Sequence, residues 1–251
     1  MGALVRLPPP GGPSGELAEA LVRFRARSSQ PNASGPGLWD EFGGRAPDGT
    51  DHRPALRELL GTASEGRCAY CEDIDPKTVD HYRPKSRFPR DTFELLNLLL
   101  ACERCNRAKD DSFPTEPTGQ PLLLNPYVAE DDPLAHLSYT GYGAVAPLAE
   151  GDLGERARET IGKLELSRGA LRDLRARTWW EFVAACENYL AGASAEAAAA
   201  IAQALQSRDL HRGVLRYLMA LSPTVRQAVA DAASEHPAVR YALARKPYCW
   251  E

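Results

Sequence analysis

Apolar residues recur at helical spacing in two short stretches near the start of the chain. One covers residues 16–27, and the other covers residues 54–63. Pro54 favours a helix start, because its fixed φ suits the first helical turn. Between them, residues 28–50 are rich in proline, glycine and serine, which predicts a loop. We expect three apolar side chains to anchor this loop to the core: Leu38, Trp39 and Phe42.

The helical pattern returns in the C-terminal part of the chain. Apolar positions spaced for helices run through residues 155–190 and then through three more stretches, 194–206, 210–221 and 224–244. These stretches differ in length and sequence, so they do not form a repeat array. Residues 113–150, in contrast, are rich in proline and glycine, and we expect them to connect two structured regions.

Between residues 66 and 112 the pattern is neither helical nor loop-like. Thr78 and Val79 favour a strand that Pro84 would end. Residues 97–101 predict a buried strand, and residues 106–109 are expected in the first turns of a helix.

These patterns predict an α+β fold with a small strand–strand–helix core. We expect four segments, namely an N-terminal leader with helices (1–65), the core (66–112), a loop-rich connection (113–154) and a helical C-terminal region (155–251).

Composition narrows the class of protein. The chain has 251 residues, of which 43% are hydrophobic and 25% charged, as in ordinary globular proteins. Its formal net charge of −4 argues against a protein that coats nucleic acid, but it permits a local basic surface. We find neither the ~20-residue apolar run of a membrane helix nor a signal-peptide pattern, which predicts a cytoplasmic protein. Thiols stay reduced there, so paired cysteines favour metal binding over disulfides.

Two C-x-x-C pairs stand out, Cys68 with Cys71 and Cys102 with Cys105. Four thiolates can close a tetrahedral shell around one zinc ion, and a closed shell is structural. The alternatives are redox pairs or chance, but no thioredoxin-like strand–helix–strand unit surrounds them. Cys186 lies in a helical apolar stretch and is expected to be a buried thiol. Cys249 has no evident partner.

Asp80 and His81 lie between the cysteine pairs at the end of the predicted strand. Adjacent strand residues point to opposite faces, although both can reach one site where a strand ends and twists. The order C-x-x-C, D-H-x-x-P, N, C-x-x-C-N-x-x-K resembles the HNH endonucleases, whose ββα-metal fold holds one divalent ion.

This resemblance implies a role for each matching residue. Asp80 would bind the metal, His81 would be the general base, and Asn97 would brace the loop that holds the histidine. Asn106 stands where the family usually has histidine, and it would be the second metal ligand. Carboxylate and amide oxygens suit Mg²⁺ or Mn²⁺, whereas the cysteines suit structural Zn²⁺. Taken singly, an Asp-His pair is ordinary surface chemistry and an asparagine before a strand is ordinarily a turn residue.

Basic residues cluster in and beside this segment and could contact nucleic-acid phosphates. Each of them alone could equally belong to a solvated face. Lys109 and Arg83 lie nearest to the motif. The full group is Arg83, Lys85, Arg87, Arg90, Arg104, Arg107 and Lys109.

The flanks resemble a subgroup of bacterial HNH proteins that includes the PtuB component of Septu anti-phage systems and the nucleases of some retrons. There the nuclease works beside an ATPase partner, PtuA, and the helical C-terminal region could dock such a partner. A turn with a helix cap would equally explain the acidic flank. The matching residues are Leu124 to Pro126, Asp131, Asp132, Pro133, His136, 160–166, Leu171 and Arg175.

Three functions remain in competition. The first is a DNA endonuclease of phage defence. The second is a zinc-stapled nucleic-acid-binding or adaptor module without catalysis, for which a histidine beside an aspartate has no use. The third is an RNase with the same motif, since no residue pattern here addresses the 2′-hydroxyl.

Overall fold

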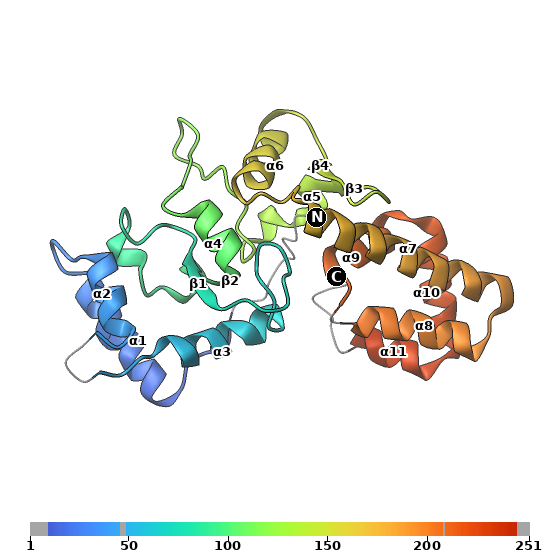
Figure 1. Ribbon diagram of the computed structural model, residues 1–251, viewed down its shortest axis with the longest axis horizontal. Coiled ribbons are helices and arrows are strands. Elements are labelled where there is room, and N and C mark those ends of the chain that lie inside the picture. The colour runs from blue at the N-terminus through green and yellow to red at the C-terminus, as the bar shows by residue number, and fades with distance from the viewer. Residues whose placement is uncertain (1–9, 46–48, 208, 245–251) are drawn as a thin grey trace. The chain divides into compact units, whose positions relative to one another are not determined.

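The computed structural model describes residues 10–45, 49–207 and 209–244. The chain forms two compact units that divide between Tyr127 and Val128. This confirms the α+β class, since both units combine helices with a small two-stranded sheet (Figure 1).

The division into two units differs from the four expected segments. The helices before residue 65 and the cysteine-rich core belong to one unit, because they share a single hydrophobic cluster. The boundary at residue 127 falls inside the segment that we expected to be a connection, 113–154.

Three helices precede the cysteine-rich segment: α1 (Gly15–Ser28), α2 (Gly35–Phe42) and α3 (Arg53–Ser64). Helix α2 lies where a loop was predicted. Its start is capped by Ser34, whose Oγ accepts a hydrogen bond from the Gly37 N–H at 3.1 Å. Pro36 is tolerated because it occupies the first turn. The expected anchoring holds, since Leu38, Trp39 and Phe42 are buried in the cluster.

The core of this unit is an antiparallel strand pair between α3 and α4 (Figure 1). The register places Asp80 opposite Leu99 and His81 opposite Leu98. Residues 106–109 lie within the first two turns of the helix that follows the strand pair, as predicted. The elements are β1 (Thr78–His81), the 3₁₀ turns η1 (Pro89–Asp91) and η2 (Leu95–Asn97), β2 (Leu98–Ala101) and α4 (Glu103–Lys109).

The second unit is mostly helical and contains one short strand pair. Its first elements are η3 (Ala129–Asp131), α5 (Pro133–His136), β3 (Leu137–Tyr139) and β4 (Val145–Pro147). The helices that follow are α6 (Gly151–Lys163), α7 (Gly169–Gly192), α8 (Ala195–Gln206), α9 (Arg212–Leu221), α10 (Pro223–Glu235) and α11 (Pro237–Ala244).

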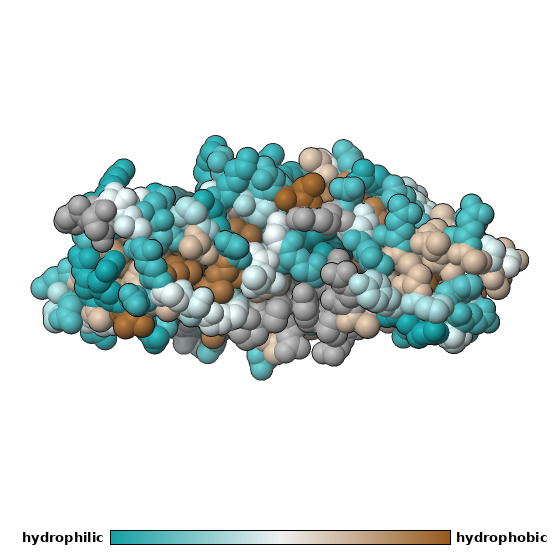
Figure 2. Space-filling view, turned by 90° about the horizontal axis from the view of Figure 1, so that it is seen from below, coloured by the Kyte–Doolittle hydropathy of each residue, from teal (hydrophilic) through white to brown (hydrophobic). Residues whose placement is uncertain are grey.

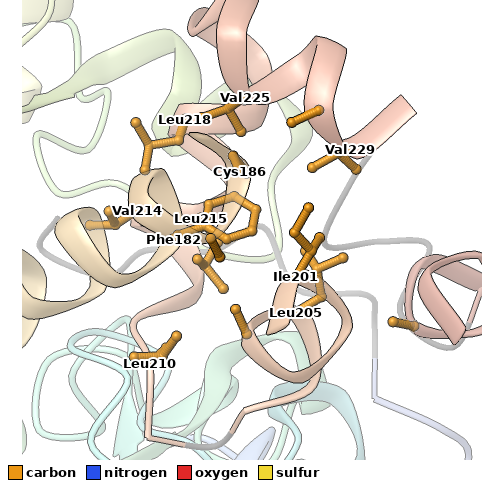
Figure 3. Packing of buried hydrophobic residues seen from close by; sticks show 14 of the residues in the cluster. Phe182, Cys186, Ile201, Leu205, Leu210, Val214, Leu215, Leu218, Val225 and Val229 are labelled. Carbon is orange, nitrogen blue, oxygen red and sulfur yellow. The ribbon is translucent and has the colours of Figure 1, made fainter. Parts of the chain in front are cut away.

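Two of the predicted helical stretches each contain two helices. The stretch 155–190 becomes α6 and α7, and the stretch 224–244 becomes α10 and α11. Pro237 explains the second break, because proline cannot continue a helix but can begin the next one. The helices pack around one apolar cluster in which Phe182 of α7 and Leu215 of α9 lie among side chains of α8 and α10 (Figure 3).

Among the described residues, no helix is long and apolar enough to cross a membrane. The face displayed in Figure 2 carries mainly hydrophilic and intermediate residues, with hydrophobic residues in small groups.

Candidate functional site

The four paired cysteines come together at one point of the first unit. All four side chains are buried, and their Sγ atoms lie within 4.8 Å of one another. Cys102 caps the N-terminus of α4, which brings the second pair beside the turn that carries the first pair. The Sγ atoms of Cys71 and Cys102 lie 3.6 Å apart.

This geometry fits a tetrahedral zinc ion. Zn–S bonds of ~2.3 Å place neighbouring sulfurs about 3.8 Å apart, close to the spacing found here. Hydrogen bonds from the thiols of Cys105, Cys68 and Cys71 hold the pKa of the Cys102 thiol far below its usual value. A thiolate is the form that binds metal, so the cluster is suited to a cation.

Asp80 is buried at the third position of β1, and its carboxylate is held by two donors. The Tyr70 hydroxyl donates to Asp80 Oδ2 at 2.6 Å. Burial, together with the neighbouring Asp80, raises the pKa of Tyr70 well above its usual value, so the phenol remains a donor. The Lys109 ammonium lies 3.2 Å from Oδ1 and 3.0 Å from Oδ2.

Lys109 does not have the position that its sequence neighbourhood predicts. Its side chain is fully buried (0% exposed), and its ammonium also donates to the backbone carbonyl of His81 at 2.6 Å. The last turn of α4 faces β1, so the ammonium points into the unit and away from solvent. The expectation that Lys109 contacts phosphate is therefore corrected: it binds Asp80 instead.

His81 is buried on the other side of β1. Its Nε2 lies 3.1 Å from the carbonyl oxygen of Thr92, which can only accept a hydrogen bond. This assigns the proton to Nε2 and leaves the lone pair on Nδ1. The Trp39 ring meets the imidazole edge to face, with centroids 4.6 Å apart.

The imidazole is also kept neutral. Burial, and then the charge of Lys85, lowers the pKa of His81 to about 3. A general base has to be unprotonated before it reacts, and this environment supplies that state at neutral pH.

Asn97 braces the loop between β1 and β2. Its Oδ1 accepts from the Arg83 N–H at 2.7 Å, and its Nδ2 donates to the carbonyls of Arg83 (3.1 Å) and Asp91 (2.9 Å). The loop that follows His81 is thus tied back to the start of β2 by one amide. These contacts match the bracing role that the resemblance implies.

Asn106 lies half-buried in α4, one turn before Lys109. Residues three apart share a helix face, so Asn106 faces the same side as the residue that contacts Asp80. Amide and carboxylate oxygens are hard ligands of the kind that a divalent cation prefers, so Asn106 and Asp80 stay the predicted ligand pair.

The other predicted phosphate contacts differ in availability. Arg107 is highly exposed, with a side chain 83% accessible. Arg83 is half exposed, but its guanidinium is 3.0 Å from Asp91 Oδ2 and lies over the Phe88 ring, 4.5 Å from the centroid. Lys85 is intermediate in exposure. Among Arg83, Lys85, Arg107 and Lys109, only Lys109 is withdrawn from solvent.

The acidic flank belongs to the second unit and is engaged in structural contacts. Asp131 forms a two-pronged pair with Arg156 (2.6 and 2.9 Å), and Asp132 forms another with Arg216 (2.7 and 2.6 Å). Asp132 also caps α5, and His136 Nε2 lies 2.8 Å from the Glu130 carbonyl. The turn-and-cap interpretation therefore describes this segment.

Cys186 is not part of the cluster. Burial raises the pKa of Cys186 to about 12, which is typical of an inert thiol. Cys249 lies outside the described residues.

Sequence reasoning missed three residues of this site. Tyr70, Trp39 and Thr92 all contact Asp80 or His81 directly. Tyr70 carried a signal, since it lies between two metal-ligand candidates. Trp39 and Thr92 carried none, because their contacts depend on how the N-terminal helices and the 82–97 loop fold back.

Comparison with known proteins agrees with this geometry. Residues 68–112 match the family model described as HNH endonuclease. We refer to the matched segment, residues 68–112, as the HNH domain. The HNH domain thus begins at the first zinc-ligand candidate and ends just beyond α4.

Two curated relatives come from one organism, Bacillus mycoides (strain KBAB4). The chain is 29% identical to the Septu protein PtuB over 153 residues, which cover 49% of this chain and 50% of PtuB. It is 26% identical to the Septu protein PtuA over 194 residues, covering 65% of this chain and 26% of PtuA. The chain therefore spans about half the length of PtuB and about a quarter of PtuA.

Proposed function

We propose that this protein is a metal-dependent endonuclease that hydrolyses phosphodiester bonds of DNA as the effector nuclease of an anti-phage system. The observation that carries the proposal is a buried, neutral histidine directly after a held aspartate, within a segment that matches the HNH endonucleases. The similarity to two Septu proteins supports the defence context.

The site would bind two kinds of ion. Cys68, Cys71, Cys102 and Cys105 would hold Zn²⁺, which joins the turn before β1 to the start of α4. Asp80 and Asn106 would hold Mg²⁺ or Mn²⁺. When bound, that ion would stabilise negative charge on the phosphoryl oxygens.

His81 would take the proton from the attacking water. Its Nε2 proton is directed to the Thr92 carbonyl, so Nδ1 is the nitrogen able to accept. Hydrolysis then breaks the P–O bond to one nucleoside, and a proton must reach the departing oxygen. Asn97 holds the loop that follows His81, and exposed cations such as Arg107 would bind the phosphate backbone.

The first test is cleavage of plasmid, single-stranded DNA and RNA with Mg²⁺ or Mn²⁺. His81→Ala is expected to abolish cleavage while the zinc content stays at the wild-type value. His52→Ala is the matched control, because it removes another buried imidazole of the same unit outside the HNH domain. It should retain activity.

Each result selects one function. Cleavage of DNA that vanishes only in His81→Ala supports the DNA endonuclease, and cleavage confined to RNA supports the RNase. Cleavage that survives in His81→Ala contradicts the assigned base. The adaptor module is supported if the protein binds nucleic acid but does not cleave it under any condition, even when the ATPase partner is added.

The proposed partner is an ATPase of the PtuA type, docked on the helical region. Co-purification of the two proteins should be lost when that region is removed. The deletion should begin at Val128 and not at residue 155. A cut at residue 155 would divide α6, whereas the two units separate between Tyr127 and Val128. Retention of the partner by a chain that lacks residues 128–251 would contradict this docking site.

A further inference from the structure

The carboxylate of Asp80 is connected to both cysteine pairs. Tyr70 lies between Cys68 and Cys71, is 1% exposed, and donates its hydroxyl to Asp80 Oδ2. Lys109 ends the helix that Cys102 caps, and its ammonium contacts both carboxylate oxygens. The elements that hold the cysteines therefore also hold the proposed metal ligand.

The hydrogen-bond capacity of this carboxylate leaves a lone pair that could bind a cation. An ionised carboxylate has about four lone-pair sites, two on each oxygen. Tyr70 donates a hydrogen bond to Oδ2 and Lys109 donates one to Oδ1, and the Lys109 ammonium also lies 3.0 Å from Oδ2. One site on Oδ1 remains, which is enough for a single metal–oxygen bond.

Tyr70 differs from Lys109 in what it can contribute. The ammonium brings a positive charge close to Asp80, and that charge would repel a second cation. The neutral phenol fixes the carboxylate without this repulsion. Because the Tyr70 ring is buried in the turn that carries two zinc-ligand candidates, it cannot move independently of the cysteine cluster.

We propose that Tyr70 is a positioning residue that couples the cysteine cluster to the catalytic ion: its hydroxyl holds Asp80 so that Oδ1 faces the divalent cation. This inference rests on the proposed function. Residues that hold a metal ligand in place are typically worth about 10–100-fold in metal affinity or activity.

The test uses Tyr70→Phe, which keeps the buried ring and removes only the hydroxyl. Tyr127→Phe is the matched control, because it also removes a single tyrosine hydroxyl from the same unit. The Tyr127 hydroxyl donates to the backbone carbonyl of Leu98 at 3.1 Å and does not contact Asp80. Both variants and the wild type are loaded with Zn²⁺ to equal content. Mn²⁺ binding is then measured without nucleic acid, by the electron paramagnetic resonance signal of free Mn²⁺.

Tyr70→Phe is expected to raise the Mn²⁺ dissociation constant about 10–100-fold, while Tyr127→Phe stays at the wild-type value. In cleavage assays, Tyr70→Phe should need more Mg²⁺ for half-maximal rate and recover most of its maximal rate at saturation. Equal Mn²⁺ affinity in Tyr70→Phe and wild type would overturn the inference. An equal loss in both variants would overturn it too, since it would indicate general loosening of the unit.

The same experiment separates this inference from the proposed function. A wild-type protein that neither binds Mn²⁺ nor cleaves nucleic acid would refute the proposed function itself. A wild-type protein that does both, beside an unaltered Tyr70→Phe variant, would refute only the positioning role.

Discussion

The ion pair between Asp80 and Lys109 is the interaction whose loss we expect to destabilise the HNH domain most. The two side chains are 4% and 0% exposed, and the Lys109 Nζ lies 3.0 Å from Asp80 Oδ2. Replacing Lys109 with methionine keeps a long, unbranched side chain but leaves the Asp80 carboxylate buried without a positive partner. Asp80→Asn leaves the ammonium buried without a negative one.

The expected loss of unfolding free energy follows from the burial of both charges. Removing one partner of a buried pair typically costs about 3–5 kcal/mol, because the remaining charge is neither solvated nor compensated. Lys109 also loses its bond to the His81 carbonyl, so the upper half of that range is expected for Lys109→Met. For a unit that spans Leu7–Tyr127, this corresponds to a lowering of the unfolding temperature by roughly 10–20 °C.

The assay is scanning calorimetry of the zinc-loaded chain, with the wild type and three variants in a double-mutant cycle. The Asp80→Asn/Lys109→Met double variant should cost clearly less than the sum of the single variants, because neither charge is then left alone. Lys77→Met is the control, since its pair with Asp75 is exposed and should contribute little. The reasoning is refuted if Lys109→Met unfolds at the temperature of Lys77→Met, or if the single effects simply add.

Three further predictions address the loop, the cysteine cluster and pH. Asn97→Ala should cost about 1–3 kcal/mol in unfolding free energy and strongly reduce cleavage, since three backbone groups lose their partner; denaturant unfolding and cleavage rates check this. Stripping zinc with a chelator should abolish hydrogen-exchange protection in β1 and β2 but not in α7; equal protection would contradict a structural zinc. Burial lowers the pKa of His81 to about 3, so unfolding takes up a proton below pH ~6.5. Stability should then fall by up to about 1.4 kcal/mol per pH unit between ~6.5 and 3, and less steeply in His81→Asn, as denaturant midpoints would reveal.

The cysteine cluster and the strand pair were predictable because their signals are local. Two C-x-x-C pairs restrict the metal geometry by themselves, and Thr78, Val79 and the apolar run before Cys102 carry strand propensity. The helix α2 was missed because its proline and glycines have loop composition. They are compatible with a helix only because Pro36 falls in the first turn and Ser34 caps it.

The partners of the site residues were less predictable, because they come from distant parts of the chain. Thr92 is eleven residues from His81, and Trp39 belongs to a helix outside the HNH domain. Sequence alone makes Lys109 a candidate phosphate contact, because it lies close to the motif residues. Its burial follows from the orientation of α4 against β1, and no spacing rule gives that orientation.

The small size of the strand pair is the reason to expect that a bound ion stabilises it. Two four-residue strands are too short to be stable alone, and the apolar cluster contacts them mainly through the N-terminal helices. The cysteines lie at the opposite ends of this arrangement in sequence: one pair precedes β1 and the other follows β2. An ion bound by all four would therefore close the segment that contains Asp80, His81 and Asn97. Residues that must stay within tenths of an ångström of one another would then depend on metal–sulfur bonds as much as on hydrophobic packing.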